Sequence, residues 1–161
     1  MKINIVLIAV GKIREPYIQE GIAEYEKRLS RFCQLQPIII DEYSIPEGCL
    51  KKEQEKIKHS ESMAIAKKIP SPSMQVCLDV KGKSMNSEQF AQWLYQFSSN
   101  AVMPLVFIAG GSLGLDSSLL KSSQLNLSIS PMTFPHTLFR LIFLEQLYRA
   151  FKIMHGEKYH K

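Results

Sequence analysis

The side chains best able to do acid–base chemistry are concentrated in the last thirty residues, from 132 to 161. Three of the four histidines lie in this segment, at His136, His155 and His160. Histidine can exchange a proton near neutral pH, although a neutral histidine that caps or packs a helix is the commoner case. Tyr159 and His160 stand in a short polar tail, where contact with a site would give them a fixed position. This end of the chain is therefore the first candidate for a functional site.

A helix predicted over residues 137–154 carries several of these side chains and is apolar on nearly every side. Glu145 and Arg149 lie four residues apart on one face, so they form either a structural ion pair or part of a site. Arg140 lies about 140° around the helix from Glu145 and is the better candidate to face an anion. A helix this apolar in a small protein also predicts a second subunit packed against it, in a homodimer.

Two loops that precede this helix are candidates for a ligand pocket. In the first, Gly110-Gly111-Ser112-Leu113-Gly114, glycines let the backbone approach a ligand, and a helix start offers free N–H groups. Its alternative is a tight turn without a ligand, and its spacing does not match the G-x-G-x-x-G of dinucleotide-binding proteins. The second loop, residues 128–135, has two prolines and almost no charge. It either lines an apolar pocket able to hold an adenine or is a rigid buried connection.

Strand and helix patterns alternate along the whole chain and must position these loops. Apolar runs predict strands over residues 2–10, 37–43, 74–80, 105–109 and 125–130. Helical periodicity and capping residues predict helices over 16–29, 47–69, 87–97 and 137–154, with a short helix ending at 120. This alternation predicts an α/β fold, a mostly parallel sheet with helices on both faces. No linker or change of composition divides it, so residues 1–161 are expected to form a single domain.

Composition and charge narrow the choice of partners only slightly. The net charge of +5 suits a polyanion such as nucleic acid, but the lysines of residues 51–68 alternate with glutamates, as on a solvated helix face. The three cysteines are isolated and show no metal-ligand spacing, so neither a metal site nor a disulfide framework is expected. The apolar opening residues are too short for a membrane span and lack a cleavage site, which predicts a cytoplasmic protein with no membrane partner.

Taken together, these motifs resemble the small SPOUT-superfamily 23S rRNA (pseudouridine-N3)-methyltransferases. The resemblance spans the chain and is most specific in GGSLGL, in MTFPH, and in LFRLIFLEQLYRAFKIMHGEKYHK with its terminal Tyr-His-Lys. It implies a homodimer, a C-terminal trefoil knot, and S-adenosylmethionine bound by the knotted loops. The cofactor-binding residues that it implies are Leu78, Gly110, Gly111, Ile129, Ser130, Pro131, Met132, Thr133 and Phe134.

The reaction implied by the resemblance is methyl transfer to N3 of a pseudouridine in helix 69 of 23S rRNA, in the assembled ribosome. This chemistry needs no metal, but the methyl donor and the acceptor nitrogen must be aligned. The N3–H must also lose its proton, and His136, Glu145 and His160 stay open as the base. Arg140 is expected to stabilise charge on the ring carbonyls, and Tyr159 to stack on a base.

Two other functional classes stay open on the residues alone. A basic α/β RNA-binding protein without catalysis would explain the charge, but not the pairing of a Gly-Gly loop with an apolar, proline-rich loop. A Rossmann-type nucleotide enzyme would explain the alternation of strands and helices, but not the glycine spacing. Titration with S-adenosylmethionine and with NAD would separate the three classes.

Overall fold

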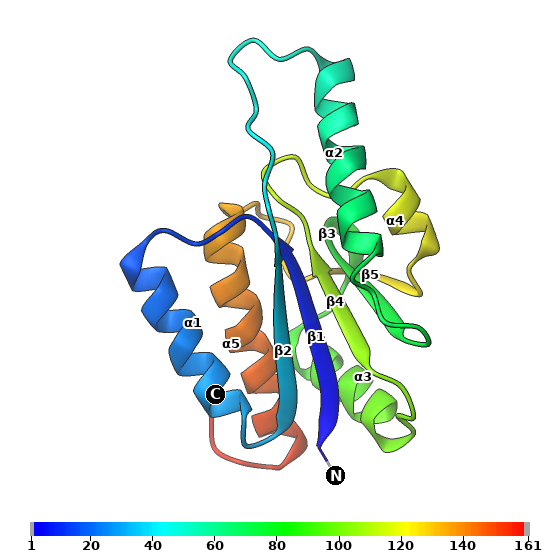
Figure 1. The fold of residues 1–161 in the computed structure, drawn as a ribbon. Coiled ribbons are helices and arrows are strands. Elements are labelled where there is room, and N and C mark those ends of the chain that lie inside the picture. The colour runs from blue at the N-terminus through cyan, green and yellow to red at the C-terminus, as the bar shows by residue number, and fades with distance from the viewer. Residues whose placement is uncertain (1, 160–161) are drawn as a thin grey trace.

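The fold is a sheet of five parallel strands, in the order β2-β1-β4-β3-β5, covered by five helices (Figure 1). The computed structural model describes residues 2–159. In chain order the elements are β1 (Ile3–Val10), α1 (Pro16–Leu29), β2 (Cys33–Ile40), α2 (Lys51–Ala66), β3 (Met74–Ser84), α3 (Ser87–Ser99), β4 (Leu105–Ala109), α4 (Ser117–Ser122), β5 (Leu125–Ser128) and α5 (His136–Met154). Among these described residues, no helix has the length and hydropathy of a membrane span.

Helices lie on both faces of the sheet because its central strands are apolar on both sides. Successive side chains of β1 point to opposite faces: Leu7 packs in the core shared with α3 and α5, and Ile8 in the core shared with α2 and α4. On the first face α5 lies between α1 and α3 (Figure 1). The predicted α/β class, with helices on both faces of a parallel sheet, is confirmed.

The helix α5 supplies much of the larger core. Phe143, Leu144 and Leu147 are buried, and the ring of Phe143 lies 4.7 Å from that of Phe107 in β4. Burial of each such side chain contributes roughly 1.5–3 kcal/mol to the free energy of folding. Other apolar side chains of α5, including Leu138 and Ile142, are only half-buried in the single chain. The helix is therefore covered by the sheet and two neighbouring helices, and retains an incompletely covered apolar side.

The boundaries of β2 and β3 differ from those predicted. β2 begins at Cys33 instead of 37, since its residues pair in register with β1 from Ile3 onward. Pro37, which has no N–H to donate, is tolerated because β2 is an edge strand. β3 continues to Ser84 instead of ending at 80, with a shift of register against β5 after Leu78. The strand pairing does not test the trefoil knot, which stays a prediction.

The close contact of β3 with β5 makes Gly82 sensitive to any side chain. A Cβ atom there would lie 2.6 Å from both the carbonyl carbon and the oxygen of Asn126. We expect Gly82→Ala to lower the free energy of unfolding by about 1–3 kcal/mol, because one backbone must move. Ser84→Ala, at an exposed position of the same strand, is the matched control. Urea denaturation measures both, and equal stability of the two variants would contradict this packing.

Candidate active site

The predicted cofactor residues meet around one cavity of about 550 Å³, beyond the ends of β4 and β5. Ligands of parallel α/β sheets commonly bind at this edge. Of the nine predicted residues, Pro131 alone is absent from its lining, and its neighbours on both sides are present. The eight that line the cavity are Leu78, Gly110, Gly111, Ile129, Ser130, Met132, Thr133 and Phe134. Their role as cofactor ligands stays a prediction, but the structure places them together.

The glycine loop that forms one wall of this cavity folds tightly on itself. The N–H of Gly114 donates to the carbonyl of Gly111 at 3.0 Å, and Gly114 adopts a φ of +78°. A Cβ atom at Gly110 would lie 2.7 Å from the carbonyl carbon of Gly114. The loop is therefore the tight turn considered from the sequence, and its backbone also faces the cavity.

The helices α2 and α4 are tied together beside this wall by Asp116. Its carboxylate accepts hydrogen bonds from the N–H groups of Ser118 and Leu119 at the start of α4, at 3.1 and 3.2 Å. It also lies 2.9 Å from Nδ1 of His59 in α2. Burial raises the pKa of the Asp116 carboxyl, but its hydrogen bonds together lower it below the ordinary value. Asp116 is thus held as an anion that joins the two helices.

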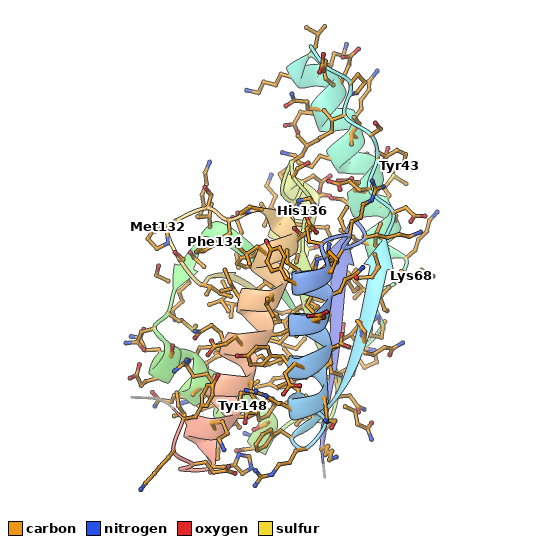
Figure 2. The ribbon with its side chains drawn as sticks, turned by 90° about the vertical axis from the view of Figure 1, so that its left-hand side faces the viewer. Tyr43, Lys68, Met132, Phe134, His136 and Tyr148 are labelled. Atoms are coloured by element: carbon orange, nitrogen blue, oxygen red, sulfur yellow. The ribbon has the colours of Figure 1, made fainter. Side chains whose placement is uncertain are left out.

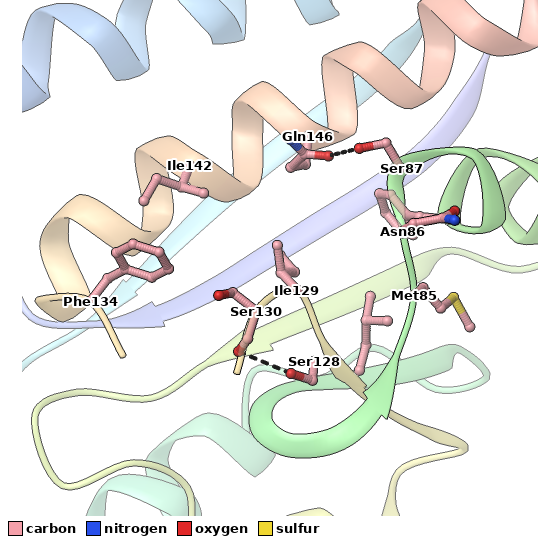
Figure 3. A pocket seen from close by; sticks show the side chains of 11 residues that line it. Met85, Asn86, Ser87, Ser128, Ile129, Ser130, Phe134, Ile142 and Gln146 are labelled. Atoms are coloured by element: carbon pink, nitrogen blue, oxygen red, sulfur yellow. Dashed lines mark hydrogen bonds between the residues drawn. The ribbon is translucent and has the colours of Figure 1, made fainter. Parts of the chain in front are cut away.

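A smaller cavity of about 330 Å³ lies on the other side of the second loop (Figure 3). It shares Ile129, Ser130 and Phe134 with the larger cavity, and α5 contributes Ile142 and Gln146. The loop is held partly by its own hydrogen bonds, such as the one from the Ser128 hydroxyl to the carbonyl of Ser130 (3.1 Å). Residues 129–134 are therefore a thin wall between two cavities, and not a fully buried connection.

His136 is the predicted catalytic residue that reaches the larger cavity. It lies at the start of α5 and lines both this cavity and a third one, of about 710 Å³, beyond β1 and β2. Its Nε2 atom is 3.3 Å from Oε2 of Glu42. Glu42 was not among the predicted site residues, and its signal in the sequence is an acidic residue just after β2, at the same edge of the sheet as the glycine loop.

Arg140, predicted to face an anion, is buried in the single chain. It is 3% exposed, and its Nη2 atom donates to the carbonyls of Val10 and Gly11 at the end of β1. Burial lowers the pKa of the guanidinium, whereas the carboxylates of Glu42 and Glu15 raise it. Arg140 therefore holds the end of β1 against the start of α5.

Glu145 lies midway along α5, and the ring of Tyr159 packs against Tyr148, about one turn further from His136 (Figure 2). The Glu145 carboxylate accepts hydrogen bonds from Arg149 and, at 3.1 Å, from the Tyr159 hydroxyl. The structural ion pair predicted as one alternative is present.

The structure does not bring all the predicted catalytic residues together within one chain. Glu145 follows His136 by nine residues, which is roughly 13 Å along a helix and half a turn around it. Burial, Tyr25 and Glu145 raise the pKa of Tyr159, so this side chain is a neutral hydrogen-bond donor. His160 lies outside the described residues.

Comparison with known proteins decides the family. Residues 1–160 match the family described as "Predicted SPOUT methyltransferase". The chain belongs to the SPOUT methyltransferase family. It is 46% identical to a protein of Acetivibrio thermocellus and 47% identical to one of Carboxydothermus hydrogenoformans, both named "Ribosomal RNA large subunit methyltransferase H". Each alignment covers 98% of this chain and 99% of the relative.

Solved structures of other methylases share the fold of this SPOUT chain. A probable methylase family protein from Haemophilus influenzae superimposes with a TM-score of 0.55 at 12% identity, over 100% of this chain and 72% of that one. A probable methyltransferase from Bordetella pertussis gives 0.53 at 10% identity, over 92% and 94% of the two chains. Family membership makes this chain a methyltransferase whose cofactor is S-adenosylmethionine.

The glycine loop offers a direct test of the cofactor site. We expect Gly110→Ala to weaken the binding of S-adenosylmethionine by roughly tenfold or more, about 1.4 kcal/mol, because the added methyl group displaces the backbone at Gly114. Gly48→Ala is the matched control, since Gly48 does not line the cavity, and its φ of +72° disfavours alanine, so that a general effect of backbone strain would appear in this variant as well. Calorimetric titration measures both affinities, and equal affinities would place the cofactor elsewhere.

Proposed function

We propose that this protein methylates N3 of a pseudouridine in helix 69 of 23S rRNA, in the assembled ribosome, as a homodimer that uses S-adenosylmethionine. The observation that carries the proposal is the full-length similarity to relatives named for methylation of the large ribosomal RNA, at 46–47% identity. The nucleotide and its position follow from the resemblance of the glycine loop, the Thr-Phe-Pro-His segment and the terminal Tyr-His-Lys. The helices and strands of residues 2–159 form one fold without a separate RNA-binding module. This favours a preassembled ribosomal surface as substrate.

The cofactor cavity, which is the one lined by both predicted loops, fits S-adenosylmethionine in size and in chemistry. Its volume of about 550 Å³ lies within the range of roughly 300–1,000 Å³ typical of small-molecule sites. The apolar side chains of Leu78, Ile129 and Phe134 would enclose the adenine, and backbone groups of the glycine loop would bind its polar edge. Asp79 and Lys58 also line the cavity, with charges opposite to those of the ammonium and carboxylate groups of the methionine part.

His136 is the best-placed base for the acceptor nitrogen. When bound, S-adenosylmethionine supplies an electrophilic methyl group, and its sulfur keeps the electron pair of the broken carbon–sulfur bond. His136 would remove the N3 proton, so that the N3 lone pair is free to form the new bond to carbon. Of the two candidate bases that the structure describes, His136 lines the cavity and Glu145 does not. A positioned base of this kind accelerates a reaction by about 10²–10⁴-fold.

A second subunit would bring the remaining predicted residues to the site. In a twofold, antiparallel pairing of two α5 helices through their first halves, the middle of one helix lies beside the start of the other. Tyr159 of one chain would then approach His136 of its partner. The half-buried apolar side chains of α5, among them Leu138 and Ile142, supply a surface for such a contact. The proposed site is therefore composite, with the cavity from one chain and the tail from the other.

The substrate form distinguishes recognition of a ribosome from recognition of free RNA. We expect efficient methylation of ribosomal particles from a strain that lacks this modification, and little methylation of a naked helix 69 stem-loop. The reason is that a single compact fold offers one rigid docking surface. Mass spectrometry of digested rRNA would locate the methyl group, with Gly110→Ala as the inactive control. A methyl group on another nucleotide, or equal rates on both substrates, would refute the corresponding part of the proposal.

A composite site predicts that two inactive chains can complement each other. Deletion of residues 158–161 should leave affinity for S-adenosylmethionine unchanged and reduce turnover by about 100-fold or more. Gly110→Ala should fail for the opposite reason. A mixed dimer of the two variants contains one site with an intact cavity and an intact tail, so activity should return. If the purified mixed dimer stays inactive, or if sedimentation shows an active monomer, the tail does not act across subunits.

A further inference from the structure

Glu42 occupies a slot between two glycines at the carboxyl end of the sheet. A Cβ atom at Gly11 would lie 2.8 Å from Oε2 of Glu42, and one at Gly111 would lie 3.0 Å from Oε1. Gly11 also has a φ of +91°, a conformation that other residues rarely adopt. The loop after β1 and the loop after β4 therefore each have a glycine where a side chain would collide with this carboxylate.

Within this slot, each carboxylate oxygen has a separate function. Oε1 accepts hydrogen bonds from the N–H and the hydroxyl of Ser112, at 3.3 and 3.1 Å. Oε2 faces Nε2 of His136 at 3.3 Å, beside the start of α5, where the helix dipole stabilises a negative charge. Glu42 thus connects the glycine loop to the first residue of α5.

The contact with Glu42 determines which nitrogen of His136 is available. A carboxylate accepts hydrogen bonds, so Oε2 of Glu42, 3.3 Å from Nε2 of His136, favours the tautomer with the proton on that nitrogen. In the neutral ring the other nitrogen, Nδ1, then has a free lone pair. A carboxylate that contacts one ring nitrogen in this way also opposes rotation of the ring.

The pair stands where two cavities adjoin. His136 and Ser112 line both the cofactor cavity and the cavity of about 710 Å³ beyond β1 and β2, whereas Glu42 lines only the second. Glu42 therefore contacts His136 from outside the cofactor cavity. A ring held from that side keeps Nδ1 free without obstructing the cofactor cavity.

We infer that Glu42 is a positioning residue for methyl transfer, which acts by holding His136. The inference rests on the proposed function, in which His136 is the base. The proton passes from the acceptor N3 to Nδ1 of His136, the N3 lone pair forms the bond to the methyl carbon, and the carbon–sulfur electron pair stays on sulfur. Glu42 itself neither gains nor loses a proton in this step.

A double-mutant cycle tests whether Glu42 acts through His136. We expect Glu42→Gln, which keeps the shape of the side chain but not its charge, to lower kcat on ribosomes by about tenfold or more. His136→Gln should lower kcat further, and adding Glu42→Gln to it should cause no additional loss. The affinity for S-adenosylmethionine should stay unchanged in all three variants. Glu47→Gln, an exposed carboxylate in the same connection, is the matched control and should retain full turnover.

The other outcomes would overturn the inference in identifiable ways. Additive losses of kcat would show that Glu42 acts independently of His136. A loss of cofactor affinity in Glu42→Gln that Ser112→Ala reproduces would show that Glu42 serves only to brace the glycine loop. Full activity of His136→Gln would remove the base through which Glu42 acts. Failure of the proposed function is a separate result, since the wild-type protein would then not methylate ribosomes at all.

Discussion

The arrangement of the site depends on one buried cation, Arg140. Burial of a guanidinium is costly unless its donors are satisfied, and here the partners are two main-chain carbonyls at the end of β1. Because Arg140 lies one turn into α5, these bonds fix the start of that helix over the edge of the sheet. His136 is then held beside Glu42 and at the margin of the cofactor cavity. The position of His136 thus follows from a contact made outside the cavity.

The length of α5 determines how the functional groups are divided. Its first residue reaches the cavity, while Glu145, midway along the helix, is hydrogen-bonded to Tyr159. The Tyr159 ring also packs edge-on against Tyr148, with ring centres 5.0 Å apart. A rigid helix cannot bend to join these groups. Within one chain α5 therefore keeps His136 apart from Glu145 and Tyr159, and the proposed pairing with a second, antiparallel α5 would bring them together.

The sequence could predict what depends on local pattern and not what depends on distant contacts. Strand and helix types, and the loops that line the cofactor cavity, follow from periodicity, glycines and prolines near one another in the chain. The role of Glu42 depends on Ser112, which is 70 residues away, and that of Arg140 on carbonyls about 130 residues away. Neither contact can be predicted from the spacing of residues along the sequence. The extension of β3 through Gly82 was missed for a similar reason, because a glycine that permits close strand approach looks locally like a turn.

The two edge strands of the sheet are built in ways that oppose aggregation. An exposed strand presents free N–H and C=O groups to other chains, and this sheet has two such edges, β2 and β5. Pro37 interrupts the row of donors along β2, and β5 has only four residues to offer. Both edges are therefore poor templates for strand addition, so sheets of neighbouring molecules are discouraged from merging into longer assemblies. Self-association is left to the helical side of the molecule, where the contact can be finite and closed.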